Sequence, residues 1–203
     1  KFDLKNNSDD NCIILDERDL PRLMASLSDW MWVFGYDVEI EEPVYVLEHI
    51  DFCQTHPVID STGNYTMCRD PRVVLAKDVV TTKPLASSSY YDAYRDAVAM
   101  CGLAMCGDLP VMNEFYSFLG RDAKVVRAVT LDMTGFVMLS RGMSTPLCSP
   151  TSDSRFSFYL AFGITPDTQV AIEERFKAIT PVWRSPGDNL QDLRKIIPVP
   201  TNI

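Results

Sequence analysis

Alternating apolar and polar positions at the start of the chain predict a β-hairpin. Residues 1–7 alternate as a half-buried strand does, and residues 12–15 form a short apolar run that would pair with them. The intervening residues 7–11 are dense in side chains that favour turns. The pattern therefore places two adjacent aspartates, Asp9 and Asp10, at the tip of the hairpin.

A helix and a further strand are predicted after this hairpin. Apolar residues recur at helical spacing over residues 20–34, with Asp19 placed to cap the start of the helix and Pro21 in its first turn. Gly35 is expected to end the helix in the left-handed conformation. Residues 36–42 then alternate between apolar and acidic side chains, which predicts a strand with one face in solvent.

A second hairpin is predicted from residues 44–55 and 64–69. These segments lie on either side of residues 60–63, whose Asp-Ser-Thr-Gly sequence is typical of a turn. A helix is then expected to begin with Asp70 as its cap and Pro71 in its first position.

The rest of the chain is predicted to be mainly helical. The expected helices cover residues 91–105, 110–119, 166–179 and 190–197, while residues 154–162 fit a helix or a strand and residues 125–138 are rich in strand-forming residues. The sequence changes character near residues 81–89, from β-rich and acidic to helical and charge-balanced. This change predicts a domain boundary.

The negative charge of the chain is concentrated at its start. The full sequence has 19 Lys and Arg against 28 Asp and Glu, a net charge of −9. Residues 1–60 hold 4 basic and 14 acidic residues, a net −10, so the remaining residues hold 15 and 14, a net +1. The overall acidity argues against an independent nucleic-acid-binding module, which is usually basic, and the acidic start favours a role in binding a cation.

Composition narrows the class of protein further. A chain of 203 residues with 46% hydrophobic residues can bury a core, and it holds no apolar run of about 18 residues that would cross a membrane. Six cysteines are too sparse here for a disulfide scaffold, so reduced thiols in an intracellular compartment are expected. The chain begins at Lys1 without a leader sequence and is expected to be a piece of a longer protein.

Asp9 and Asp10 are the sharpest candidates for chemistry. Two crowded carboxylates repel each other unless a cation neutralises them, and hard oxygen ligands suit Mg²⁺ or Mn²⁺. Such sites drive phosphoryl transfer, in which two ions roughly 4 Å apart hold the attacking and leaving oxygens. The alternative is that the Asn-Ser-Asp-Asp sequence only makes a solvated turn.

Two further clusters surround the second hairpin. A zinc site has little support, because the histidines and cysteines there lack the compact paired spacing of zinc modules, and packing is the favoured interpretation. These residues are His49, Cys53, His56 and Cys68. The cations after the hairpin could contact an RNA phosphate backbone or could form a solvated helix face. They include Arg69, Arg72 and Lys77.

Several segments also occur in a familiar order. Residues 6–13 contain Ser-Asp-Asp at the hairpin tip, residues 20–43 hold the helix and the following strand, and residues 48–58 contain the sequence Phe-Cys-Gln. This order resembles motifs C, D and E of a viral RNA-dependent RNA polymerase, most closely the tombusvirus-like group of positive-strand RNA viruses. The resemblance continues over residues 67–78, 101–104, 107–116 and 161–167.

The resemblance implies an α+β fold that belongs to a right-hand polymerase. Residues 1–80 would form the last part of the palm, with two β-hairpins and a helix, and residues 81–203 would form a mainly helical thumb. Asp9 and Asp10 would bind the catalytic Mg²⁺ or Mn²⁺ ions, in a turn where Ser8 replaces the usual glycine of the family.

The resemblance also implies a reaction and partners. The RNA 3′-hydroxyl would attack the α-phosphate of a nucleoside triphosphate and release pyrophosphate, for viral genome replication. Phe52, Cys53 and Gln54 would be the primer grip, which steadies the growing 3′ end. The implied partners are template and product RNA, nucleoside triphosphates, the upstream part of the same polymerase and other replicase proteins. The implied location is a membrane-associated replication complex in the host cytoplasm. No membrane anchor is expected in this segment of the protein.

The hypotheses differ in what they predict for the structure. The polymerase hypothesis places Asp9 and Asp10 at an exposed tip beside the Phe52 hairpin, and expects this segment to be inactive without the upstream motifs. A non-catalytic acidic module that binds a basic partner would instead spread the aspartates on a flat surface with no hairpin nearby. An unrelated metal-dependent phosphoesterase would need further carboxylates or histidines around Asp9.

Overall fold

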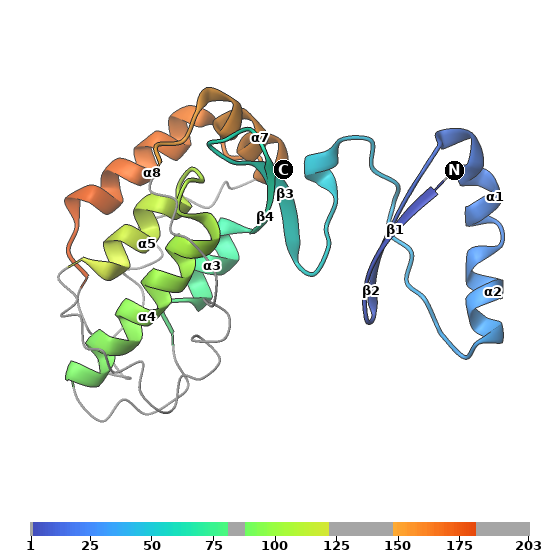
Figure 1. The fold of residues 1–203 in the computed structure, drawn as a ribbon, viewed down its shortest axis with the longest axis horizontal. Coiled ribbons are helices and arrows are strands. Elements are labelled where there is room, and N and C mark those ends of the chain that lie inside the picture. The colour runs from blue at the N-terminus through green and yellow to red at the C-terminus, as the bar shows by residue number, and fades with distance from the viewer. Residues whose placement is uncertain (1, 81–87, 122–147, 182–203) are drawn as a thin grey trace, which may run out of the picture.

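The computed structural model of the chain describes residues 2–80, 88–121 and 148–181. The elements within these ranges are β1 (Phe2–Asn7), β2 (Asp10–Leu15), η1 (Glu17–Asp19), α1 (Leu20–Met24), α2 (Leu27–Val33), η2 (Leu47–His49), β3 (Thr55–Ile59), β4 (Tyr65–Arg69), α3 (Pro71–Lys77), α4 (Ser88–Cys106), α5 (Met112–Gly120), α7 (Ser152–Phe162) and α8 (Pro166–Ala178). The architecture combines helices with two separate antiparallel hairpins, β1–β2 and β3–β4. In Figure 1 the first hairpin, α1 and α2 lie on one side of the molecule and the later helices on the other.

The first hairpin forms as the pattern predicts. β1 and β2 pair from Phe2 with Leu15 to Asn7 with Asp10, so the turn consists of Ser8 and Asp9 alone. Asp9 therefore lies in the turn itself, and Asp10 is the first residue of the returning strand.

The helix predicted over residues 20–34 is divided in two. α1 ends at Met24 and α2 begins at Leu27. Between them, the hydroxyl of Ser26 donates to the carbonyl oxygen of Arg22 at 3.0 Å. A serine that bonds back to the preceding turn in this way competes with the backbone ladder and bends or interrupts a helix.

The ends of this helical segment follow the prediction in part. Asp19 occupies the capping position of α1, but its side chain makes no capping hydrogen bond. Asp16 caps the preceding η1 instead, since it accepts a hydrogen bond from the backbone nitrogen of Arg18 at 3.1 Å. Gly35 has a φ angle of +82°, which confirms the expected left-handed residue after α2.

Two strand predictions are wrong. Residues 36–42 form no regular secondary structure. A strand needs a hydrogen-bonding partner, and within the described residues β1 and β2 pair only with each other. Residues 44–55 do not form one strand either, because η2 occupies part of this segment and β3 begins only at Thr55. The chain reverses at Cys53 and Gln54, and neither residue type signals a turn.

The second hairpin and the helix after it confirm the local predictions. β3 and β4 are joined by a turn in which Gly63 has a φ angle of +86°. The Asp60 carboxylate accepts hydrogen bonds from the backbone nitrogens of Thr62 and Asn64 at 2.8 and 2.9 Å, which holds the turn closed. Asp70 caps α3 through the backbone nitrogen of Arg72 at 2.8 Å.

The helices after α3 also follow the sequence pattern. α4, α5 and α8 confirm the predicted helices within a few residues of their expected ends. α7 shows that residues 154–162, which fitted a helix or a strand, are helical. The strand-rich segment 125–138 and the last predicted helix, 190–197, lie outside the described residues.

The buried core joins the second hairpin and α3 to these helices. Val58 of β3, Cys68 of β4 and Val74 of α3 belong to the same cluster of buried residues as Phe115 and Phe158. The core therefore includes residues from both sides of the predicted boundary, and the division into a palm part and a thumb stays a prediction. In contrast, no side chain of residues 2–47 is buried.

The contact between α4 and α5 requires a glycine. A Cβ atom at Gly102 would overlap the ring of Tyr116, which is 1% exposed and so has no room to move. Only a residue without a side chain lets the two helices approach this closely.

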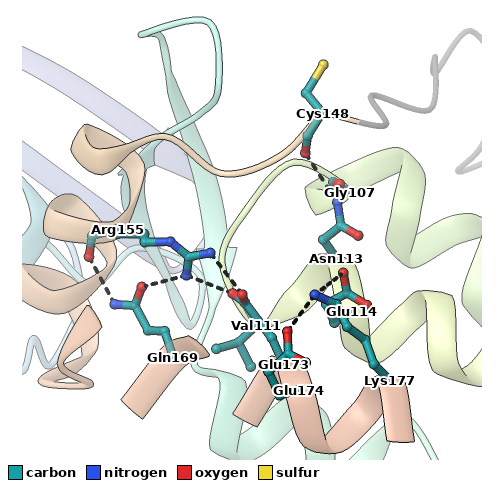
Figure 2. Close-up of polar contacts among 10 residues, drawn as sticks. All are labelled: Gly107, Val111, Asn113, Glu114, Cys148, Arg155, Gln169, Glu173, Glu174 and Lys177. Atoms are coloured by element: carbon teal, nitrogen blue, oxygen red, sulfur yellow. Dashed lines mark hydrogen bonds and ion pairs between the residues drawn. The ribbon is translucent and has the colours of Figure 1, made fainter. Parts of the chain in front are cut away.

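A buried polar network holds α7, α8 and the start of α5 together (Figure 2). The two terminal nitrogens of Arg155 each lie 2.9 Å from a different carboxylate oxygen of Glu173. Glu173 also accepts a hydrogen bond at 2.9 Å from the backbone nitrogen of Val111, a buried residue with a φ angle of +65°. Gln169 donates to the carbonyl oxygens of Arg155 and Ile164 at 2.9 and 2.8 Å. The Glu173 carboxylate thus forms an ion pair and also accepts a hydrogen bond from a residue with a strained backbone conformation.

Candidate functional site

The tip of the first hairpin has an unusual backbone conformation. Ser8 has a φ angle of +62°, whereas Asp9 does not have a positive φ. A two-residue turn with positive φ only at its first residue has the pattern of a type II′ turn, which favours glycine at that place. Ser8 therefore adopts a conformation that suits glycine.

Asparagine side chains hold the tip. Asn6 and Asn11 are paired across the strands, and the amide nitrogen of Asn6 lies 2.5 Å from the amide oxygen of Asn11. Asn6 also donates to the carbonyl oxygen of Ser8 at 3.3 Å, and Asn11 donates to that of Asp9 at 3.2 Å. These contacts tie the turn carbonyls to the hairpin and leave both aspartate side chains outside the network.

The two carboxylates are available to a cation. Asp9 and Asp10 are exposed, and no arginine, lysine or histidine of the described residues forms an ion pair with either. Adjacent, unneutralised carboxylates fit a hard divalent cation such as Mg²⁺. The described ranges contain no group of three or more potential ligands, so these two side chains would supply only part of a metal site.

The Phe-Cys-Gln sequence forms a second strained turn. Cys53 and Gln54 have φ angles of +55° and +59°. The turn is closed by hydrogen bonds from the Phe52 nitrogen to the Thr55 oxygen at 2.9 Å and from the Thr55 nitrogen to the Phe52 oxygen at 3.1 Å. Two central residues with positive φ define a type I′ turn, which normally holds Asn and Gly. Strain of this kind is concentrated at functional sites.

The two strained turns contact each other. The amide nitrogen of Asn7 lies 3.1 Å from the sulfur of Cys53. Asn7 is paired with Asp10 across the first hairpin, so both side chains lie on the same face of it. The structure therefore brings the aspartate turn and the Phe-Cys-Gln turn side by side, although they are 46 residues apart in the sequence.

The three candidate cations have different surroundings. Arg69 forms an ion pair with Asp78 at 2.6 Å, and Tyr116 donates to the same carboxylate at 2.8 Å. Arg72 donates to the carbonyl oxygen of Phe162 at 2.8 Å, at the end of α7. These arginines stabilise the fold where they are. Lys77 is exposed and forms no ion pair with the described residues. Contacts of these cations with RNA stay a prediction.

The tyrosine and thiol next to Arg69 are strongly buried. Burial is the main reason that the pKa of Tyr116 is raised, and the nearby Cys106 and Asp78 raise it further. Burial also raises the pKa of the Cys106 thiol to about 12 and raises that of Cys68. These groups stay neutral at ordinary pH and belong to the core.

His56, Cys53 and Cys68 near the second hairpin have partners within the protein. The ring nitrogen Nδ1 of His56 lies 3.1 Å from the carbonyl oxygen of Glu48, and the ring packs edge-on against Phe162 at a centroid distance of 5.3 Å. Cys68 is buried in the core and Cys53 contacts Asn7. All six cysteines are free thiols.

Comparison with known proteins places the chain in a family. The family model of viral RNA-dependent RNA polymerases matches residues 1–184, and the chain belongs to this family. The RNA-directed RNA polymerase of Tobacco necrosis virus (strain A) is 40% identical over 173 residues, which cover 84% of this chain and 24% of the relative. That of Maize chlorotic mottle virus is 39% identical over 189 residues, covering 91% of this chain and 20% of the relative.

The match extends to further plant-virus polymerases. The RNA-directed RNA polymerase of Turnip crinkle virus is 36% identical over 87% of this chain and 23% of its own length. The chain thus spans roughly a fifth to a quarter of these relatives. No solved structure gave a significant match. None of the described helices is long and apolar enough to cross a membrane.

Some contacts of the site carry no clear signal in the sequence. The sequence predicts the hairpin that holds Asn7 and the segment that holds Glu48, but it predicts neither the contact of Asn7 with Cys53 nor that of Glu48 with Ser157. Asn7 could have been found from its position opposite Asp10, since residues that flank a two-residue turn share a face. The partners of Glu48 and Ser157 could not, because 109 residues separate them.

Proposed function

We propose that this chain supplies the metal-binding hairpin and the primer grip of an RNA-directed RNA polymerase. The observation that carries the proposal is the contact between Asn7 and Cys53, which joins the aspartate turn to the Phe-Cys-Gln turn at 3.1 Å. An acidic module for a basic partner predicts no hairpin beside the aspartates, so this contact favours the polymerase. The reaction is transfer of a nucleoside monophosphate to an RNA 3′-hydroxyl, directed by a template.

Each residue has a task in this proposal. Asp9 and Asp10 hold Mg²⁺ or Mn²⁺ together with ligands from elsewhere in the full protein, and these ions, when bound, supply positive charge for the phosphoryl transfer. Asn7 keeps the aspartate turn at a fixed distance from the grip. The growing 3′ end of the RNA is contacted by the primer grip, which consists of Phe52, Cys53 and Gln54. The surroundings that enforce the strained conformation of the grip also fix its position, as alignment of reacting groups requires.

The proposal extends to the biology of the full protein. Its partners are template and product RNA, nucleoside triphosphates, the upstream part of the polymerase and other replicase proteins. It replicates a viral genome at membrane-associated complexes in the host cytoplasm. The Arg69, Arg72 and Lys77 side chains are the candidates for contacts with the RNA backbone, with Lys77 the most accessible of them.

The test uses the full-length polymerase and a template RNA. Asp9→Ala and Asp10→Ala are expected to lower nucleotide incorporation by at least about 100-fold, because metal charge stabilises the transition state by several kcal/mol. The same variants are expected to weaken Mn²⁺ binding, measured by electron paramagnetic resonance. Asp29→Ala is the matched control, since Asp29 is an exposed aspartate on α2. RNA synthesis by Asp9→Ala at the rate of this control would refute the proposal.

A further inference from the structure

A buried carboxyl group lies close to the Phe-Cys-Gln turn. Glu48 belongs to η2 and is only 5% exposed. Its oxygen Oε1 accepts a hydrogen bond from the hydroxyl of Ser157 at 2.8 Å, and the hydroxyl of Tyr65 lies 3.5 Å from the same atom. Among the described residues no cation pairs with it. Burying such a group is unfavourable unless hydrogen bonds compensate, so its position depends on these hydroxyls.

Ser157 connects two segments that are distant in the sequence. This residue lies in α7 and is 1% exposed. Its hydroxyl accepts a hydrogen bond from the backbone nitrogen of Ile59 in β3 at 2.9 Å while it donates to Glu48. A serine hydroxyl has one hydrogen to donate, and Glu48 takes it. The single side chain therefore fastens both β3 and η2 to α7.

The fastened segments enclose the turn. Glu48 precedes Phe52 by four residues, and the carbonyl oxygen of Glu48 lies 3.1 Å from Nδ1 of His56, which follows the turn. The turn thus lies between η2 and β3, and a hydrogen bond joins the residues on its two sides. Cys53 and Gln54 have left-handed backbone conformations. For residues other than glycine, such a conformation persists only where the surrounding structure enforces it.

We infer that Glu48 and Ser157 are positioning residues that hold the Phe-Cys-Gln turn at its place beside the aspartate hairpin. They act through η2 and β3, which the hydrogen bonds of the Ser157 hydroxyl join to α7. Helix α7, more than a hundred residues further along the chain, thereby sets the alignment of the RNA 3′ end. The inference rests on the proposed polymerase function and adds to it the residues that align the grip.

The experiment measures nucleotide addition by the full-length polymerase on a preformed primer–template RNA in a single turnover. Ser157→Ala is expected to lower the rate constant of addition roughly tenfold or more, because small misalignments of reacting groups have large effects. The amplitude of the reaction should stay constant. A loss of folded protein alone would lower the amplitude and leave the rate constant unchanged. Ser152→Ala is the control, since Ser152 is exposed at the start of α7 and should behave as the unsubstituted protein.

Substitutions at Glu48 give an independent measurement. Glu48→Gln keeps an oxygen acceptor for Ser157 and is expected to retain most of the rate, whereas Glu48→Leu should lose as much as Ser157→Ala. The double variant Glu48→Leu with Ser157→Ala should be no slower than the slower single variant, because both changes remove the same link. The double variant leaves no buried carboxylate without its donor, so it should be more stable than Ser157→Ala, and the main group that loses a partner is the Ile59 nitrogen.

The outcomes separate the two proposals. If Ser157→Ala and the double variant add nucleotides as fast as Ser152→Ala, or lose only amplitude, the positioning role is refuted while the polymerase function stands. If the unsubstituted protein adds no nucleotide, the proposed function itself fails.

Discussion

Removal of the Glu173 carboxylate should strongly destabilise the helical part of the protein. Glu173 is 5% exposed and binds both terminal nitrogens of Arg155 and the backbone nitrogen of Val111, each at 2.9 Å. The substitution Glu173→Ala leaves the Val111 nitrogen buried without this acceptor, which costs about 1–3 kcal/mol. It also leaves the partly buried Arg155 without its counter-ion, and breaking a buried ion pair costs up to about 3–5 kcal/mol. Because the two effects overlap, the free energy of unfolding should fall by about 3–5 kcal/mol.

Urea denaturation followed by circular dichroism measures this change. The neighbouring Glu174→Ala provides the control, because the Glu174 side chain is 64% exposed and forms its ion pair with the half-exposed Lys177 at 2.9 Å. Exposed pairs of this kind contribute about 0–1 kcal/mol. The double variant Arg155→Met with Glu173→Met should recover much of the loss, since a buried ion pair can be replaced by packed apolar groups. Equal effects of Glu173→Ala and Glu174→Ala would refute the reasoning.

Three further predictions concern backbone strain, packing and pH. Ser8→Gly should raise the free energy of unfolding by up to about 1 kcal/mol in urea titrations and retain RNA synthesis, because glycine adopts positive φ without strain; a loss of stability would contradict the type II′ assignment of the turn. Gly102→Ala should lower the melting temperature through a loss of about 1–3 kcal/mol, because its Cβ would overlap the buried Tyr116 ring, and an unchanged melting temperature would contradict the close helix packing. The raised pKa values of Cys106, Cys68 and Tyr116 mean that the folded state holds protons that the unfolded state releases. Stability should therefore be complete below the ordinary thiol pKa of 9.0 and decline as the pH rises toward about 12, the pKa of folded Cys106; equal stability at both ends of this range, by urea titration, would argue against the burial of these groups.

Local signals predicted the elements whose hydrogen bonds are local. Asp70 with Pro71 and Thr165 with Pro166 begin helices where expected, and Gly63 has the positive φ of a turn. These positions depend on caps and backbone preferences that a few adjacent residues determine. The aspartate hairpin could be predicted for the same reason, because its turn residues and its alternating strands are contiguous.

The same local reasoning failed where a distant partner or a hidden reversal decided the outcome. Residues 36–42 alternate as a strand does but have no partner strand in the described structure. The reversal at Cys53 and Gln54 has no glycine or asparagine to signal it, because the surrounding contacts enforce the left-handed conformation. The single helix over residues 20–34 was expected from periodicity, which does not register the competing hydrogen bond of Ser26.

By itself, the sequence determined the acidic hairpin tip, the starts of most helices and the candidate aspartates, since each of these depends on neighbours along the chain. The tertiary structure alone decided that the Phe-Cys-Gln turn contacts Asn7, that Arg69 and Arg72 serve the fold, and that Ser157 reaches Glu48. Those contacts join residues 9 to 109 positions apart. Their formation depends on how the whole core packs, and no local pattern encodes that.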